Sequence, residues 1–237
     1  METVSLVFGG SVLAPPQLDP QFLHEVARRL VAWSRDRRLF VVCGGGSPAR
    51  AYIQAARQVG VGEEALDRIG IAATRLNAST LAAVARASGG DCAIQVPTTT
   101  QDALRLAERH RLVVMGGTEP GHSTDYVAVE LALASGAARF VNATNVDGVY
   151  TRDPSKHKDA KRLDALSFQD LLGIIEERAW TAAGAPGVLD GPSTVLVAEN
   201  GIPTNVCLGT DLDNLGEAVC GRPFRGTTVR GEKVTVQ

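Results

Sequence analysis

Three short apolar segments each run directly into a cluster of glycines and then into a segment with helical periodicity. These units are residues 4–8 followed by Gly9 and Gly10, residues 39–43 followed by residues 44–46, and residues 112–115 followed by Gly116 and Gly117. Strands that are apolar throughout and alternate with helices are typical of a parallel sheet covered on both faces. The sequence therefore predicts an α/β fold with a mostly parallel central sheet.

The rest of the chain continues this alternation. Helices are predicted at residues 20–35, 48–59, 66–85, 101–110, 125–134, 167–178, 193–200 and 211–220. Further strands are predicted at residues 92–96, 139–143, 203–208 and 226–230, and loops at residues 116–124, 144–161 and 181–192. No linker is visible, so the 237 residues can form one large α/β domain or two closely fused lobes.

Charge and composition favour a small-molecule ligand. The 24 basic and 26 acidic side chains give a net charge of −2, which provides no broad attraction for nucleic acid or an anionic membrane. No apolar run approaches the ~20 residues of a membrane span. Cys43, Cys92, Cys207 and Cys220 lack a metal-like CxxC spacing and are read as mostly buried, reduced thiols. A cytoplasmic protein is expected, without nucleic-acid or membrane partners.

The glycine clusters should lie together, because the carboxyl ends of parallel strands share one edge of the sheet, where ligands of open α/β folds bind. In the third unit, Ser123 and Thr124 can cap the following helix, and free N–H groups at a helix start favour an anion such as phosphate. An ordinary capped loop has the same chemistry. The chain has no P-loop lysine motif and no GxGxxG in its first unit, which argues against P-loop enzymes and dinucleotide oxidoreductases.

Six segments resemble a known family in order and spacing. They are GGSVLAP from residue 9, GGGSPARAYI from 44, DRIGIAATRLNA from 67, PTTTQDAL from 97, MGGTEPGHSTD from 115 and NATNVDGVYTRDPSKHKDA from 142. Over about residues 4–230 the chain resembles the uridylate (UMP) kinases of the amino acid kinase family, archaeal-type branch. The resemblance implies a single three-layer αβα sandwich, residues 1–237, with an acceptor part near 1–135 and a nucleotide-donor part near 136–237.

The resemblance also implies an activity, which is transfer of the γ-phosphoryl of Mg-ATP to UMP to give UDP in pyrimidine nucleotide synthesis, by a homohexamer. Implied catalytic residues are Gly9, Gly10 and Asp125. Implied acceptor-binding residues are Gly44, Gly45, Arg50, Asp67, Gly117, Ser123 and Thr124. Implied donor-binding residues are Ser11, Thr144, Asn145, Gly148, Tyr150, Asp153 and Lys156. No residue is assigned as a metal ligand.

The chemistry of these residue types agrees with the implied roles. A guanidinium such as that of Arg50 forks onto phosphate oxygens, and a carboxylate such as that of Asp67 accepts hydrogen bonds from ribose hydroxyls. A surface arginine and a helix-capping aspartate are the simpler readings. Asp125 would organise the catalytic groups, or serve as a first-turn acid of its helix. The phosphate of UMP is already anionic, so no general base is required and His122 need not be one.

The chain departs from the family at positions that often carry lysine. These positions hold Val7, Ser47 and Val195. Loss of a transition-state cation can cost about 10³- to 10⁵-fold in rate unless another group substitutes, and Lys156, Arg152 or Arg75 could do so. Tyr126 stands where the family has a small residue, and it can narrow the acceptor pocket or fill a gap.

Two alternatives stay open. One is a non-catalytic nucleotide- or oxyanion-binding protein on the same fold, such as a sensor or a molybdate-storage-like protein. The other is a kinase for another small phosphate or carboxylate acceptor. Isopentenyl phosphate kinase is disfavoured because its histidine near the triple glycine is missing at residues 47–50.

Overall fold

The computed structural model describes residues 1–152, 154, 156–174 and 188–236. Its centre is a seven-stranded sheet of order β3-β2-β1-β4-β8-β9-β7. The strands are β1 (Glu2–Phe8), β2 (Arg37–Cys43), β3 (Leu112–Met115), β4 (Arg139–Thr144), β7 (Ala165–Leu166), β8 (Thr204–Leu208) and β9 (Thr227–Val229). All neighbours pair in parallel except β8 and β9. Strands β5 (Val149–Tyr150) and β6 (Arg162–Leu163) form a separate antiparallel pair.

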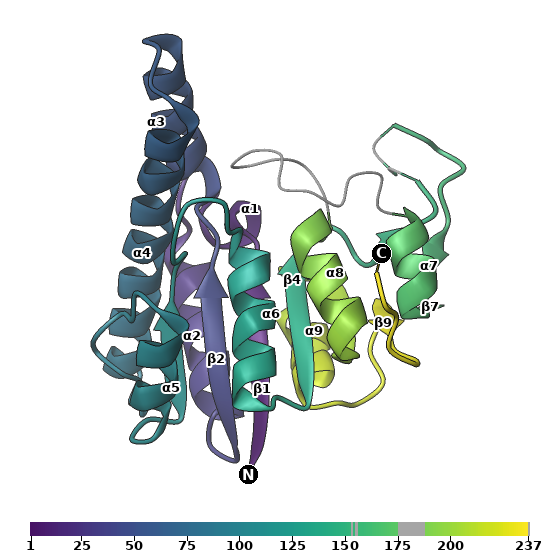
Figure 1. Cartoon of the computed structure of the whole chain (residues 1–237). Helices are drawn as coiled ribbons and strands as arrows, with labels where there is room; N and C mark the ends of the chain where they lie inside the picture. Colours follow the sequence, from purple (N-terminus) through teal and green to yellow (C-terminus); the bar gives the residue numbers. More distant parts are fainter. Residues whose placement is uncertain (153, 155, 175–187, 237) are drawn as a thin grey trace.

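Helices cover both faces of this sheet (Figure 1). They are α1 (Gly10–Leu13), α2 (Pro20–Trp33), α3 (Gly46–Gln58), α4 (Glu63–Ala87), α5 (Thr100–Ala107), α6 (Thr124–Ser135), α7 (Phe168–Ile174), α8 (Gly191–Asn200) and α9 (Leu212–Val219). One core lies between the sheet and α2, α4 and α9, and a second lies between the sheet and α5–α8. The predicted α/β fold, a three-layer αβα sandwich with a mostly parallel sheet, is confirmed.

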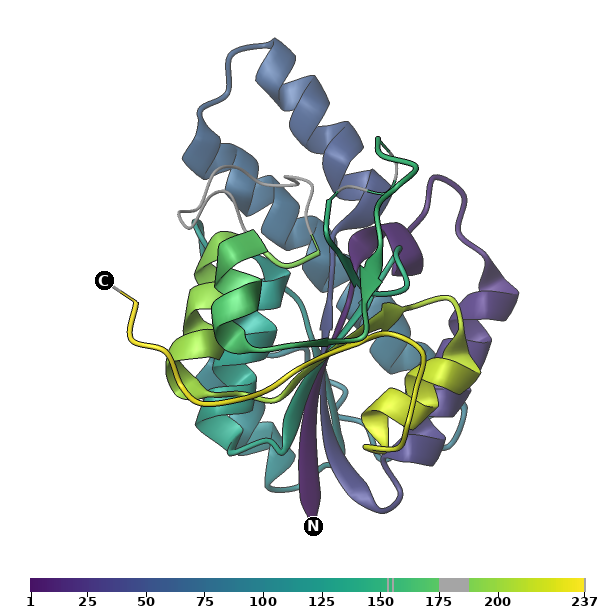
Figure 2. The same ribbon diagram turned by 90° about the vertical axis from the view of Figure 1, so that its right-hand side faces the viewer.

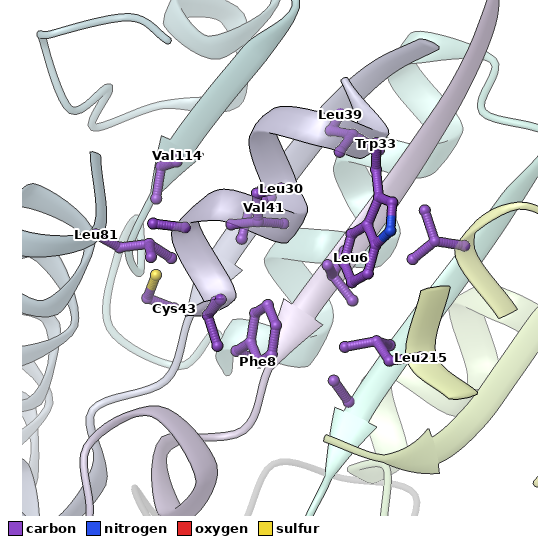
Figure 3. Close-up of a cluster of buried hydrophobic side chains, with 14 of the residues drawn as sticks. Leu6, Phe8, Leu30, Trp33, Leu39, Val41, Cys43, Leu81, Val114 and Leu215 are labelled. Atoms are coloured by element: carbon purple, nitrogen blue, oxygen red, sulfur yellow. The ribbon is translucent and has the colours of Figure 1, made fainter. Parts of the chain in front are cut away.

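The two cores explain why the strands are apolar at every position. Along β2, Leu39 and Val41 pack into the first core, while Phe40 and Val42 pack into the second. Successive side chains of a strand point to opposite faces, so a strand between two helical layers must be apolar on both. Figure 3 shows the first core, in which Leu39 and Val41 of β2 lie with Trp33 of α2 and other apolar side chains.

Several predicted elements needed correction. Residues 92–96 are not a strand, because only Cys92 makes an isolated bridge to Leu112 before the chain leaves the sheet edge, with Ile94 77% exposed. The short elements α1, β5, β6 and β7 were not predicted, and β5 lies within the predicted 144–161 loop. Residues 175–178 of the predicted 167–178 helix and residues 181–187 of the predicted 181–192 loop lie outside the described residues.

The carboxyl ends of the parallel strands meet at one edge of the sheet. Figure 1 shows α1, which follows β1, at the end of the molecule opposite the N-terminus, and Figure 2 shows the same end after a quarter turn. The α3–α4 pair extends past this edge (Figure 1). The sheet order places the end of β1 between the ends of β2 and β4. The glycine turns after β1 and β2 are therefore neighbours, as predicted.

Candidate active site

Two glycine turns pack backbone against backbone at the centre of this edge. A Cβ atom added to Gly10 would lie 2.1 Å from the Gly46 nitrogen, and one added to Gly44 would lie 2.3 Å from the Gly10 nitrogen. On the other side, the Gly9 amide donates to the carbonyl oxygen of Ala143 at the end of β4 (2.9 Å). The turn after β1 thus touches both neighbouring strand ends, and glycine is required for that approach.

The predicted acceptor residues lie on the β2 side of this contact. Arg50 is exposed on α3, and its guanidinium donates to the Ser47 hydroxyl (3.1 Å). Asp67 is half-buried on α4, where its carboxylate accepts from the Gly121 amide in the loop after β3 (2.9 Å). Arg50 makes no ion pair with any described residue, so its charge is available to an anion. Asp67 does not cap α4, which begins at Glu63.

The start of α6 brings two carboxyl groups near each other. Ser123 is the N-cap and accepts from the Tyr126 amide (2.9 Å), which confirms the predicted cap. Burial, and secondly the charge of Asp190 at the start of α8, raise the pKa of Asp125 to about 8. Asp190 caps α8 through the Ser193 amide, and its Oδ2 is buried without a hydrogen-bond partner among the described residues. Asp190 was not predicted as a site residue, because its sequence context indicates only a helix cap.

A pocket of about 340 Å³ lies on the β4 side. Its lining includes Asn145 and Tyr150, both predicted as donor-binding, and also Asp147, Leu208 and Arg225, which were not predicted. The Tyr150 hydroxyl donates to Asp147 (2.6 Å), and this hydrogen bond lowers the pKa of Asp147 and raises that of Tyr150. The bond fixes the Tyr150 ring beside the pocket.

The remaining described residues predicted to bind the donor are not part of the lining of this pocket. Gly148 has φ of 149°, and a Cβ atom there would lie 2.7 Å from the Thr227 hydroxyl, so the turn requires glycine. Thr144 is buried at the end of β4, and Ser11 and Lys156 are exposed on α1 and in the loop after β5. The predicted residue Asp153 lies outside the described residues.

The positions that often carry lysine in related kinases differ in their surroundings. Val7 is fully buried in the second core, and Val195 packs against that core from α8. A lysine at position 7 would place an ammonium group among apolar side chains. Ser47, by contrast, accepts the hydrogen bond from Arg50, so a positive group already lies next to that position.

Each of the three predicted substitutes, Lys156, Arg152 and Arg75, has interactions of its own in the structure. Arg152 lies 3.5 Å from Asp159 in an ion pair. Arg75 binds carbonyl oxygens of the loop after β3 and contacts no described carboxylate.

Tyr126 stacks on His122 of the loop after β3, with ring centroids 4.3 Å apart and planes at 33°. Its bulk therefore packs on the loop beside the proposed acceptor position.

The described residues give little support for a membrane span, a metal site or thiol chemistry. No described helix is long and apolar enough to cross a membrane. Among the same residues, no group of three or more His, Cys, Asp or Glu side chains could hold a metal ion. All four cysteines are free, three of them buried, and burial raises the pKa of Cys207 to about 12. Thiol chemistry is therefore not favoured at that position.

Comparison with known proteins gives a family assignment. The model of the amino acid kinase family matches residues 6–207, most of the chain. The chain belongs to the amino acid kinase family. Curated relatives in this family include the uridylate kinase of Archaeoglobus fulgidus, 41% identical over 226 residues that cover 95% of this chain and 99% of the relative. The uridylate kinase of Thermoplasma volcanium is 36% identical and covers 96% and 97%.

Solved amino acid kinase structures agree with this assignment. The crystal structure of the Archaeoglobus fulgidus uridylate kinase matches with a TM-score of 0.85 and 40% identity, covering 97% of this chain and 100% of that one. The UMP kinase of Bacillus anthracis matches with a TM-score of 0.79, 20% identity and coverage of 97% and 96%. The second match shows a shared fold only. The resemblance read from the sequence motifs is confirmed at the level of the family.

Proposed function

We propose that this chain is a uridylate kinase that transfers the γ-phosphoryl group of ATP to UMP, producing UDP. The observation that carries the proposal is the position of Gly9 and Gly10, which touch the Gly44–Gly46 turn on one side and the end of β4 on the other. Arg50 and Asp67, which we assign to the acceptor, belong to the helices α3 and α4 that follow the Gly44–Gly46 turn, and the pocket lined by Asn145 and Tyr150 follows β4. Full-length similarity to curated uridylate kinases supports the same activity. The non-catalytic alternative is supported by Val7, Ser47 and Val195, which stand where lysine is common in the family.

The geometry suits a reaction that needs positioning more than covalent chemistry. The UMP phosphate is already a nucleophile, so the protein has to hold two nucleotides in line and offset the charge of the transferred group. The glycine turns allow backbone amides to approach that group closely. Arg50 is assigned to the acceptor phosphate and Tyr150 to the donor base. Asp67 is assigned to the acceptor ribose. Its carboxylate already accepts a hydrogen bond from the Gly121 amide, but a carboxylate can accept several hydrogen bonds, so it can also accept from ribose hydroxyls.

Magnesium would enter with the ATP phosphates. Mg²⁺ is usually held by one or two carboxylates together with phosphates and water, and Asp125 and Asp190 supply such oxygens. The buried, unpartnered Oδ2 of Asp190 fits this donor set. When bound, Mg²⁺ would supply positive charge to the phosphate oxygens. The chain's own contribution is Arg50 beside Ser47, which offers a cation where a lysine is common in the family.

The proposal keeps three expectations from the sequence. One is a cytoplasmic homohexamer, and sedimentation of the purified protein can test the hexameric state. Another is a single domain, residues 1–237, with acceptor binding near residues 1–135 and donor binding near 136–237. The last is that Asp153 and Lys156 contribute to the donor side.

The direct test of the substrate is a comparison of acceptors. ADP release from Mg-ATP should be measured with UMP, CMP, dUMP, AMP and no acceptor. The proposal predicts that UMP gives the highest kcat/KM. A higher value with another nucleotide would transfer the assignment to that acceptor, and release without any acceptor would indicate an ATPase.

Arg50→Ala is expected to raise the KM for UMP by about 10- to 100-fold, because a charge-assisted contact to phosphate is lost. The KM for ATP should change less than threefold by the same reasoning. Steady-state kinetics with each substrate varied separates the two values. Arg68→Ala is the control, since Arg68 is exposed on α4 and paired with Glu64. Equal changes in both KM values would reject the assignment of Arg50 to the acceptor.

Tyr150→Phe is expected to raise the KM for ATP by about 3- to 10-fold, because the hydroxyl that anchors the ring to Asp147 is lost. The KM for UMP should stay within experimental error. Tyr52→Phe, a change at an exposed tyrosine of α3, is the matched control. An unchanged KM for ATP would mean that ring anchoring is irrelevant to donor binding.

A further inference from the structure

One segment of α4 binds both glycine loops of the site. The Asn77 side-chain amide donates to the carbonyl oxygens of Gly44 (2.8 Å) and Gly45 (3.2 Å). Two residues earlier, the Arg75 guanidinium donates to the carbonyl oxygens of Gly117 (3.0 Å) and Thr118 (2.8 Å). These bonds join parts of the chain that are 32 to 43 residues apart in sequence.

The loop after β3 is attached to α4 at three further points. The Thr74 hydroxyl accepts from the Gly117 amide (2.8 Å), and Asp67, two turns earlier on the helix, accepts from the Gly121 amide (2.9 Å). The loop also lies close to the helix backbone, since a Cβ atom on Gly116 would be 2.6 Å from the Arg75 nitrogen. Residues 116–121 are therefore fixed to α4 at both ends.

Arg75 is suited to fixing a loop and also leaves positive charge beside it. Its planar guanidinium reaches two successive carbonyl oxygens at once, which a lysine ammonium cannot do with the same geometry. Carbonyl oxygens do not neutralise its charge, and within the described part of the chain it forms no ion pair with a carboxylate. The half-buried guanidinium therefore supports a loop that is proposed to bind an anionic acceptor.

We propose that Arg75 and Asn77 are positioning residues that act on different parts of the reaction. Arg75 holds the 116–121 loop in the shape that binds the acceptor nucleotide, so it governs acceptor affinity. Asn77 holds the Gly44–Gly45 turn against Gly10, where the phosphoryl group is transferred, so it governs turnover. This inference rests on the proposed function.

The test compares Arg75→Ala with Arg86→Ala. Arg86 lies on the same helix and donates to a backbone carbonyl, that of Cys92 (2.7 Å), away from the glycine loops. Arg75→Ala should raise the KM for UMP by about tenfold or more, because a displaced loop loses its fit to the acceptor, with the KM for ATP within about threefold. Arg75→Lys should recover only part of the affinity. Arg86→Ala should lower the melting temperature without separating the two KM values.

Asn77→Ala supplies the second arm. It should lower kcat by about tenfold or more and change the KM for UMP less than Arg75→Ala does, because the displaced turn contacts Gly10. The inference is overturned if Arg75→Ala changes both KM values equally, if Arg86→Ala produces the same separation, or if Asn77→Ala leaves kcat unchanged.

Calorimetry separates failure of this inference from failure of the proposed function. Should the wild-type chain show no UMP-dependent turnover, UMP binding by the wild type and by Arg75→Ala is measured directly. A loss of affinity of about tenfold supports the role of Arg75 although the kinase assignment fails. Equal affinities overturn the inference. A wild-type chain that neither binds UMP nor phosphorylates it rejects both.

Discussion

Replacing Asp125 by asparagine is expected to lower UMP-dependent turnover by about two orders of magnitude, the usual cost of removing one preorganised electrostatic group. Asp125 lies in the first turn of α6 and interacts electrostatically with Asp190 at the start of α8. With Mg-ATP bound, nearby positive charge should favour its ionised form. The amide of asparagine has nearly the same shape but cannot carry this charge, so turnover should fall while the fold is retained.

The same substitution should stabilise the protein without ligands. The pKa of Asp125 is raised from an ordinary 3.8 to about 8 in the folded chain. Between these values the folded state holds a proton that the unfolded state releases, so this group lowers stability as the pH rises from about 4 to 8. Asparagine removes that cost. The variant should therefore melt above the wild type at pH 8, by a margin that shrinks toward pH 4.

Melting curves from pH 4 to 8 together with kcat measurements check both effects. Asp213→Asn is the control, because Asp213 is an exposed carboxylate on α9 with a side chain 84% accessible. Full activity in Asp125→Asn would remove this carboxylate from the mechanism. A melting difference that does not depend on pH would show that Asp125 is ionised in the free protein.

Gly10→Ala is expected to abolish measurable turnover and lower the melting temperature. The added methyl would lie 2.1 Å from the Gly46 nitrogen and 2.7 Å from its Cα, which are backbone atoms that cannot move aside independently. The turns after β1 and β2 would have to separate, and a displacement of about 1 Å at a reacting centre can cost about 10²-fold in rate. Loss of close packing adds a cost in stability.

Gly173→Ala is the matched control for this prediction. A Cβ atom there would meet nothing within 4 Å, and Gly173 lies in α7, where alanine favours the helix. Activity should be unchanged and stability equal or slightly higher. Turnover by Gly10→Ala within about threefold of the wild type would show that contact between the glycine turns is not needed for positioning.

Much of this architecture could be predicted from local sequence signals. The run Leu112–Met115 gave a strand with the observed bounds, and the glycines after each apolar run placed the turns at one edge. The Ser123 cap was also recognised from its local pattern. These features depend on residues within a few positions of each other, where propensity and periodicity carry information.

The contacts that shape the site could not be predicted in this way. Asn77 and Arg75 bind backbone carbonyls more than 30 residues away, and such a bond leaves no mark on the sequence pattern of either partner. Asp190 reads as a helix cap, and only packing of α8 beside α6 brings it near Asp125. The failed strand at residues 92–96 has the same origin, because pairing with the sheet is a contact distant in sequence and only Cys92 of this run makes one, with Leu112 of β3.

This chain is proposed to transfer a phosphoryl group although Val7 and Val195 stand where lysine is common in its family. The most direct test is the rate of UDP formation from Mg-ATP and UMP by the purified wild-type protein, with the product identified by ³¹P NMR. We expect UDP to form at a rate of at least about one per second, which is ordinary for a kinase. Binding of both nucleotides without formation of UDP would contradict it and indicate a nucleotide-binding protein.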